Sequence, residues 1–258
     1  MPFPTSKRVY YDKNPLEQVV CQARFTPILR IDTEVPSTFQ EHLRSPFPSY
    51  QRAAIVLPVG LPPGVPPELL GRLAGGSVTH EFGSADGIWK LLLSHDQLTL
   101  VTTKYRDWSD FKSKMRMGLD ALVKSYDLRT FVRLGLRYQD RIDRRALGLD
   151  GVDWRELINP EALGELAIPT IARYVEQHLR ELIVTVSEID GRVRIVHGIQ
   201  PRAGGDNTYI IDADFFTEQP RDTKDADNAL DQFNSRAGHL FRWYITPRLH
   251  EAMGPRDA

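Results

Sequence analysis

Residues 130–142 read Thr-Phe-Val-Arg-Leu-Gly-Leu-Arg-Tyr-Gln-Asp-Arg-Ile, and this stretch decides how the rest of the chain is interpreted. Successive side chains of a β-strand point to opposite faces of its sheet. The charged positions therefore share one face, and they are Arg133, Arg137 and Arg141. The other face carries the apolar residues Leu134, Leu136 and Tyr138. The pattern predicts a strand with one side to bury and one charged side.

A second stretch nearer the N-terminus has the same character. Residues 17–31 alternate well enough to predict a strand, with Arg24 on the polar side and Cys21 on the apolar side. The segment Cys21-Gln-Ala-Arg24-Phe25 matches Leu134-Gly-Leu-Arg137-Tyr138. Arg24 thus occupies the position equivalent to Arg137, which suggests that the chain contains an internal duplication.

Both predicted strands are followed by a similar order of elements. After the first come a short helix behind Pro36, strands at 77–83, 88–94 and 97–104, and an amphipathic helix at 108–126. After the second come a short helix near 153–158, an irregular stretch at 160–169, strands at 178–188, 192–199 and 208–216, and a final helix that ends or kinks at Pro247. Asp86-Gly87 and Asp190-Gly191 predict hairpin turns, because the glycine of such a pair tolerates positive φ.

The predicted fold is therefore α+β, with two similar β-α-β-β-β-α halves that form antiparallel sheets and pack their long helices on one face. The halves are 1–129, with a Pro-rich loop at 58–76, and 130–258, within one compact unit. The alternative is two unrelated α+β halves that share a common element order.

Composition limits the classes of function. The 258 residues include 33 Lys+Arg and 34 Asp+Glu, for a net charge of −1, and 41% are hydrophobic. This balance is too apolar for a disordered chain and lacks the excess of basic residues expected of a general nucleic-acid binder. The single cysteine, Cys21, cannot form an internal disulfide. No apolar run approaches a membrane span, and the first residues lack the apolar core of a signal peptide. We expect a cytoplasmic protein with no membrane partner.

The common catalytic and cofactor motifs are absent. The sequence contains no Gly-x-Gly-x-x-Gly, Gly-x4-Gly-Lys-Ser/Thr, Gly-x-Ser-x-Gly or His-Glu-x-x-His. The 7 histidines lack the spacing of metal ligands, and Cys21 falls on an apolar phase, where a thiol acts as a small hydrophobe. We therefore predict no cofactor and no metal, and the sequence argues against an enzyme without excluding one.

The candidate site is a set of charged residues on one predicted sheet face. Its members are Arg24, Arg133, Arg137, Arg141, Asp212 and Asp214. Arginine can hold a carboxylate or phosphate through two parallel hydrogen bonds, and the aspartates could receive a cation, a hydroxyl or a basic residue of a partner. The simpler alternative is that these residues pair with one another across strands.

The opening residues carry a resemblance. Tyr11-Asp-Lys13-Asn14-Pro15-Leu16 and, after it, Val20-Cys21-Gln22-Ala-Arg24-Phe25 resemble the start of a sporadically distributed bacterial family of unknown function and of about this length. Later similarities include Phe47-Pro-Ser-Tyr50, Ile211-Asp212-Ala-Asp214-Phe215 and Ile245-Thr246. The resemblance implies one shared architecture and no assigned activity, so it carries over no catalytic residue.

Three hypotheses of function follow. The first is a non-enzymatic binding or accessory protein that acts on a protein partner or small ligand through the charged sheet face. For this hypothesis we expect a protein partner that is encoded by a neighbouring gene. The second is a nucleic-acid-binding protein that uses Arg133, Arg137 and Arg141. The third is an enzyme of unrecognised type that uses Asp212 and Asp214 with Arg137.

Overall fold

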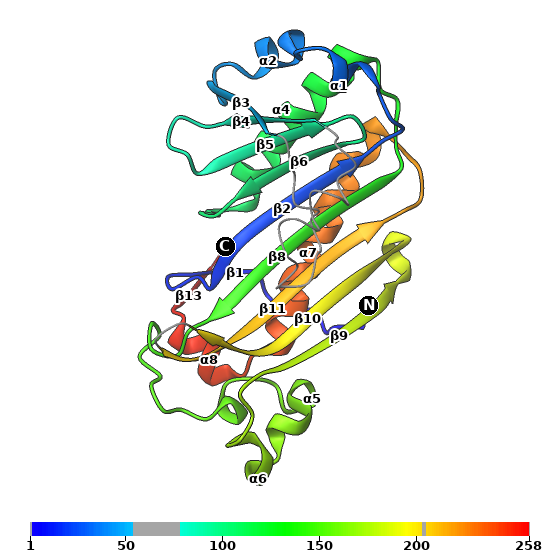
Figure 1. Ribbon diagram of the computed structural model, residues 1–258. Coiled ribbons are helices and arrows are strands. Elements are labelled where there is room, and N and C mark those ends of the chain that lie inside the picture. The colour runs from blue at the N-terminus through cyan, green and yellow to red at the C-terminus, as the bar shows by residue number, and fades with distance from the viewer. Residues whose placement is uncertain (1, 54–77, 203–204, 258) are drawn as a thin grey trace. The chain divides into compact units, whose positions relative to one another are not determined.

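The computed structural model describes residues 2–53, 78–202 and 205–257 (Figure 1). It is an α+β structure with antiparallel strands, as the sequence predicts, and one large sheet contains strands from both predicted halves. The strand order is β3 (Ser49–Ala53), β4 (Thr79–Gly83), β5 (Trp89–Ser94), β6 (Gln97–Thr102), β2 (Leu16–Arg24), β8 (Arg133–Ile142), β11 (Gly205–Thr217), β10 (Gly191–Arg202) and β9 (His178–Val186). The predicted Pro-rich loop at 58–76 lies outside the described residues.

Two smaller sheets join distant parts of the chain. Strand β1 (Val9–Tyr11) pairs antiparallel with β13 (Pro255–Asp257), and β12 (Arg221–Asp222) pairs with β7 (Thr130–Phe131). In the described parts of the chain, no helix combines the length and the apolar character needed to cross a membrane.

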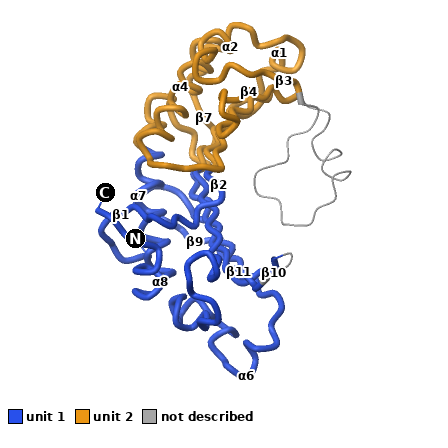
Figure 2. Tube along the Cα trace, turned by 90° about the vertical axis from the view of Figure 1, so that its left-hand side faces the viewer, with its two compact units in different colours: residues 1–19, 136–217, 229–258 blue, residues 20–135, 218–228 orange. Residues whose placement is uncertain are grey.

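The chain forms two compact units, which Figure 2 shows in different colours. Unit 1 comprises residues 1–19, 136–217 and 229–258, and unit 2 comprises residues 20–135 and 218–228. Each unit therefore contains segments from both sides of the 129/130 boundary drawn from the sequence. That boundary marks the proposed repeat, and the repeat stays a prediction.

Unit 2 carries the first long helix, α4 (Trp108–Tyr126), which spans the residues that the sequence predicts. The Asp107 side chain caps its start by accepting a hydrogen bond from the Asp110 amide. The buried face of α4 includes Phe111 and Met115, and it approaches the sheet closely at Gly118. A Cβ atom at Gly118 would lie 3.2 Å from both terminal methyl groups of Leu91. The periodicity in the sequence therefore marks a helix that packs on β5 and β6.

The predicted strand at 17–31 is too long. Strand β2 ends at Arg24, and α1 (Arg30–Thr33) replaces its last residues. Pro27 lacks an amide hydrogen and cannot continue a central strand, so the chain leaves the sheet there. The next helix, α2 (Ser37–Leu43), lies where Pro36 predicts one, whereas strand β3 after Pro48 was not predicted.

Unit 1 carries most of the second long helix, α7 (Ala226–Tyr244), which runs behind β8, β11 and β10 in Figure 1. Two contacts establish which sheet face it covers. The Tyr138 hydroxyl donates to Asn234 Oδ1 at 2.9 Å, and the ring centroids of His197 and Tyr244 lie 4.8 Å apart. Pro247 follows the end of α7 and begins α8 (Pro247–Ala252), where a proline at the first helical position needs no amide hydrogen.

Short helical turns fill the remaining segments. Between β8 and β9 they are η1 (Trp154–Glu156), α5 (Pro160–Leu163), η2 (Gly164–Ala167) and α6 (Pro169–Ala172). The stretch 160–169, which the sequence leaves irregular, therefore contains helical turns that start at its prolines. The turns η3 (Ser187–Ile189) and η4 (Thr223–Asp225) precede β10 and α7.

Candidate functional site

The six candidate residues divide between the two units. Arg24 and Arg133 belong to unit 2, whereas Arg137, Arg141, Asp212 and Asp214 belong to unit 1. The alternation that the sequence predicts for β8 is present: Leu134, Leu136, Tyr138, Asp140 and Ile142 are buried, and the three arginines are half-buried. Because Tyr138 contacts α7, the arginines at 137 and 141 lie on the opposite face of the unit 1 strands.

We call this opposite face the outer face of unit 1. Strand register defines its members, since residues directly opposite each other in antiparallel strands share a face. One row is Thr185, Arg192 and Phe216, and the next is Ile183, Arg194 and Asp214. The following rows are Glu181, Val196 and Asp212, and then Leu179, Gly198 and Ile210. Strand β8 adds Arg137, Gln139 and Arg141.

Arg137 and Asp212 form the central contact of the outer face. Arg137 Nε donates to Asp212 Oδ1 at 2.6 Å, and its NH2 group donates to Oδ2. Gln139 Nε2 donates to the same Oδ2 at 3.2 Å. The two charged side chains are only 12% and 14% exposed. Burial lowers the pKa of Arg137, but the hydrogen bonds and charge of Asp212 outweigh it, and the net shift is upward. The pair is therefore a bidentate ion pair held in one geometry.

Two other arginines of this face, Arg141 and Arg194, are also bonded to acidic groups. Arg141 Nε donates to Glu17 Oε1 at 2.6 Å, and its NH1 group donates to Thr208 Oγ1 at 3.0 Å. Arg194 Nε donates to Glu181 Oε1 at 2.7 Å. Asp214 lies opposite Arg194 in the strand register, and its charge also raises the pKa of Arg137. The outer face thus holds a near-neutral network of ion pairs.

In unit 2, the two remaining candidates make separate contacts. Arg24 is exposed, and its NH2 group lies 3.0 Å from Asp96 Oδ2. Arg133 NH1 donates to Gln22 Oε1 at 2.8 Å, and Gln22 Nε2 donates to Gln97 Oε1 at 2.8 Å. The predicted equivalence of Arg24 and Arg137 therefore does not extend to their contacts, because Arg24 forms an exposed single bond and Arg137 a half-buried double one.

Sequence reasoning missed the apolar residues of the outer face. Ile183 is 57% exposed, and Val196 and Ile210 are half-buried beside the ion pairs. The alternation of 178–188 shows two classes of position, but the sequence does not reveal which class faces solvent. Only the register of β9 on β10 shows that Ile183 lies next to Arg194.

Sequence reasoning also missed two titratable groups beneath the sheet. Asp140 is 8% exposed, and burial, followed by the charge of Asp212, raises the pKa of its carboxyl well above the usual range. His197 is 3% exposed, and its Nδ1 lies 2.8 Å from the Tyr209 hydroxyl. Burial lowers the pKa of His197 to about 4. Both groups break the apolar pattern of their faces in the sequence, which is the signal that could have identified them.

This arrangement suits binding better than proton transfer. Both carboxylate oxygens of Asp212 accept hydrogen bonds, so the group is poorly placed to act as a base. Within residues 2–53, 78–202 and 205–257, no three His, Cys, Asp or Glu side chains come together in a way that could hold a metal ion. Cys21 is completely buried.

Comparison with known proteins gives no further guide to the site. A scan against models of protein families found none that matches the chain, and a search of curated proteins also found no match.

Proposed function

We propose that the chain is a cytosolic binding protein without chemistry of its own, and that the outer face of unit 1 binds a protein partner. The observation that supports the proposal is that three arginines on that face are already bonded to carboxylates. Arg137, Arg141 and Arg194 are each already bonded to a carboxylate, and they surround aliphatic side chains that remain accessible.

The composition of this face matches that of protein interfaces. Such interfaces combine an apolar centre with a polar rim, and arginine is enriched in them. Ile183, Val196 and Ile210 supply apolar surface on three adjacent strands, and Arg192 lies 5.1 Å from the centre of the Phe216 ring. Because Arg137, Arg141 and Arg194 are already paired with carboxylates, the face needs no highly charged partner. We therefore expect a partner that places an apolar side chain over Ile183.

The same pairing disfavours the two alternatives. A nucleic-acid surface needs arginines that are free to neutralise phosphates, whereas Arg137 and Arg141 are bonded to Asp212 and Glu17. An active site that used Asp212 and Asp214 with Arg137 would need to break a half-buried bidentate pair. Protein binding requires neither change.

The identity of the partner is a separate part of the proposal. We propose a protein encoded by a neighbouring gene, because dedicated partners are commonly made together. Co-expression with each neighbouring product, followed by size-exclusion chromatography and calorimetric titration, tests this proposal. A stable complex with one product is the expected result. Failure of every neighbouring product to bind would contradict it.

A pair of variants tests the proposed surface. Ile183→Asp introduces a charge at the apolar centre of the outer face, and the affinity should fall by about tenfold or more. Ile171→Asp is the matched control, because Ile171 is similarly exposed, at 44%, but belongs to α6. If Ile171→Asp abolished binding while Ile183→Asp bound with full affinity, the interface would lie elsewhere on the protein. Tight, salt-dependent binding of nucleic acid would instead favour the arginine-strip hypothesis.

The internal duplication and the family resemblance belong to this proposal. Two parallels support the duplication. Strands β6 and β11 are each the last strand of an antiparallel series, and each lies next to the first strand that its half contributes to the large sheet, β2 or β8. A long helix follows in both cases. Separate sequence profiles for 16–126 and 133–244, built from homologues, should match each other. Unrelated profiles would contradict the duplication.

A further inference from the structure

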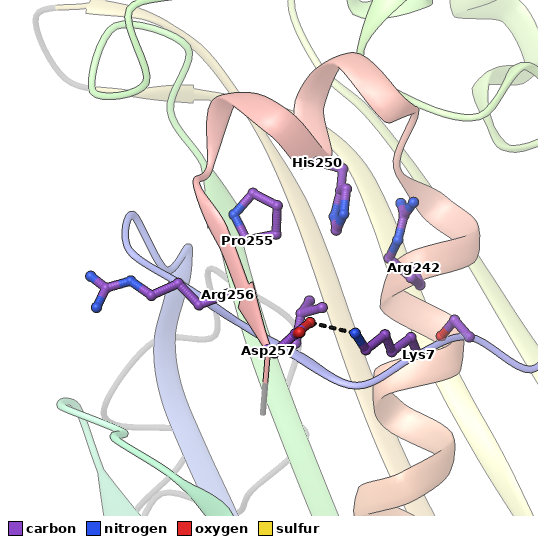
Figure 3. A pocket seen from close by; sticks show the side chains of 8 residues that line it. Lys7, Arg242, His250, Pro255, Arg256 and Asp257 are labelled. Atoms are coloured by element: carbon purple, nitrogen blue, oxygen red, sulfur yellow. Dashed lines mark hydrogen bonds and ion pairs between the residues drawn. The ribbon is translucent and has the colours of Figure 1, made fainter.

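Unit 1 contains a cavity of about 350 Å³ whose lining residues are not those of the outer face. The cavity lies between the residues before β1, the end of α7, helix α8 and strand β13 (Figure 3). The residues that matter for its chemistry are Lys7, Val9, Arg242, His250, Pro255 and Asp257. Figure 3 shows Arg242 and His250 reaching the cavity from two different helices, with Pro255 on the other side of the imidazole ring.

The charges around the cavity do not cancel. Lys7 Nζ lies 2.5 Å from Asp257 Oδ1, and this exposed pair is neutral as a whole. Arg256 forms an ion pair with Asp12. Among the described residues, by contrast, Arg242 has no hydrogen-bond or ion-pair partner. The charge of Glu251 also acts on His250, but no carboxylate among the described residues forms an ion pair with Arg242. A half-buried guanidinium without an ion-pair partner is costly, so it presents a positive charge to the cavity that a bound anion would neutralise.

His250 adds a directed hydrogen-bond donor. The Tyr11 hydroxyl lies 2.8 Å from His250 Nδ1, and the two rings meet edge to face. Burial raises the pKa of Tyr11 to about 12, so its hydroxyl keeps its proton. The described residues offer this hydroxyl no other acceptor, and we therefore assign Tyr11 as the donor and Nδ1 as the acceptor.

The tautomer of His250 follows from this contact. Burial, with help from the charge of Arg242, lowers the pKa of His250, so the ring is neutral at pH 7. A neutral imidazole whose Nδ1 accepts a hydrogen bond carries its proton on Nε2. The ring lines the cavity, and Nε2–H remains available to an acceptor there.

We propose that this cavity binds a small organic monocarboxylate, which is a function additional to partner binding. The two carboxylate oxygens of the ligand accept hydrogen bonds from Arg242 and from His250 Nε2. The short apolar part of the ligand contacts Val9 and Pro255. A monocarboxylate matches the single unpaired charge, and an arginine with a second donor is well suited to its two oxygens. The apolar wall disfavours inorganic phosphate, which is hydrated on all sides.

Calorimetric titration of the full chain at pH 7 tests the proposal, with butyrate, butyramide and inorganic phosphate as probes. Butyrate should bind, and butyramide, which has the same shape without the charge, should not. Phosphate that binds as tightly as butyrate would overturn the assignment to a carboxylate. An absence of butyrate binding would overturn the site itself.

Variants separate the named residues from general charge effects. Arg242→Gln should weaken butyrate binding by about tenfold or more, because it removes the charged donor. Arg248→Gln on α8 is the matched control, since Arg248 is paired with Glu156, and it should bind like the wild type. Equal binding by Arg242→Gln and the wild type would refute the proposal. If Arg242→Gln does not fold, His250→Phe supplies the second test, and unchanged affinity there would also refute it.

Discussion

A double-mutant cycle on Arg137 and Asp212 tests whether the central contact of the outer face is structural. The variants are Arg137→Gln, Asp212→Asn and the double substitution. Each single change leaves a charged group without its partner at a position that is only 12–14% exposed. Removing one member of a fully buried pair costs about 3–5 kcal/mol, so with this residual exposure we expect about 2–3 kcal/mol for each single variant. The double variant should cost less than the sum.

The matched control is the pair of Arg141 and Glu17 on the same strand. These side chains are 27% and 52% exposed, and such pairs contribute about 0–1 kcal/mol. Urea unfolding of all variants, followed by circular dichroism, measures the free energies of unfolding. The coupling energy of Arg137 with Asp212 should exceed that of the control pair by about 1 kcal/mol or more. Equal coupling energies would refute the view that burial makes the central pair structurally important.

Three further predictions concern stability and reactivity. The pKa of His197 falls from 6.5 to about 4 in the folded chain. Lowering the pH from 6.5 to 4 should therefore reduce the free energy of unfolding by ~3 kcal/mol. In acid unfolding curves, His197→Gln should make the free energy of unfolding less dependent on pH. Gly198 has φ +140, and a Cβ atom there would lie 1.8 Å from the His178 carbonyl oxygen. Gly198→Ala should therefore lower the free energy of unfolding by at least about 3 kcal/mol, as measured by thermal unfolding. The control is Gly238→Ala, which has open space on α7 and should raise it by up to about 1 kcal/mol. Buried Cys21 should not react with a thiol reagent in the native chain; rapid labelling would show that β2 opens.

The sequence predicts elements best where one period continues over many residues. Helix α4 has the predicted bounds because its apolar residues recur over five turns and Asp107 provides a cap. The prediction is less complete near prolines. At Pro27 the strand ends earlier than predicted. Pro247 follows the end of α7, as predicted, but it also begins a further helix that was not predicted, since proline can either interrupt an element or start one.

A turn can also be predicted correctly while its geometry is not. In the hairpin between β9 and β10, Asp190 adopts the left-handed conformation, with φ 47, and not the glycine that follows it. In an Asp-Gly pair, either residue can adopt a positive φ. The pair therefore indicates a turn but does not determine which residue takes the left-handed conformation.

The candidate site was predictable in its residues and not in its contacts. Period-2 alternation alone placed Arg137 and Arg141 on one face of β8. Their partners depend on which strand lies beside β8 and in what register, and the sequence specifies neither. From the sequence alone, Asp212 was therefore equally able to bind a ligand or to pair with an arginine. The cavity at Arg242 was beyond sequence reasoning, since it combines residues from both ends of the chain.

The pairing of β1 with β13 has a consequence for synthesis on the ribosome. Asp12 donates its amide hydrogen to the Gly254 carbonyl, so a segment translated early receives its partner only when residues 255–257 have left the exit tunnel. Unit 2, by comparison, has all its segments once residue 228 has emerged. Unit 2 can therefore fold while segments of unit 1 are still being translated, and unit 1 is completed only after residues 255–257 have emerged.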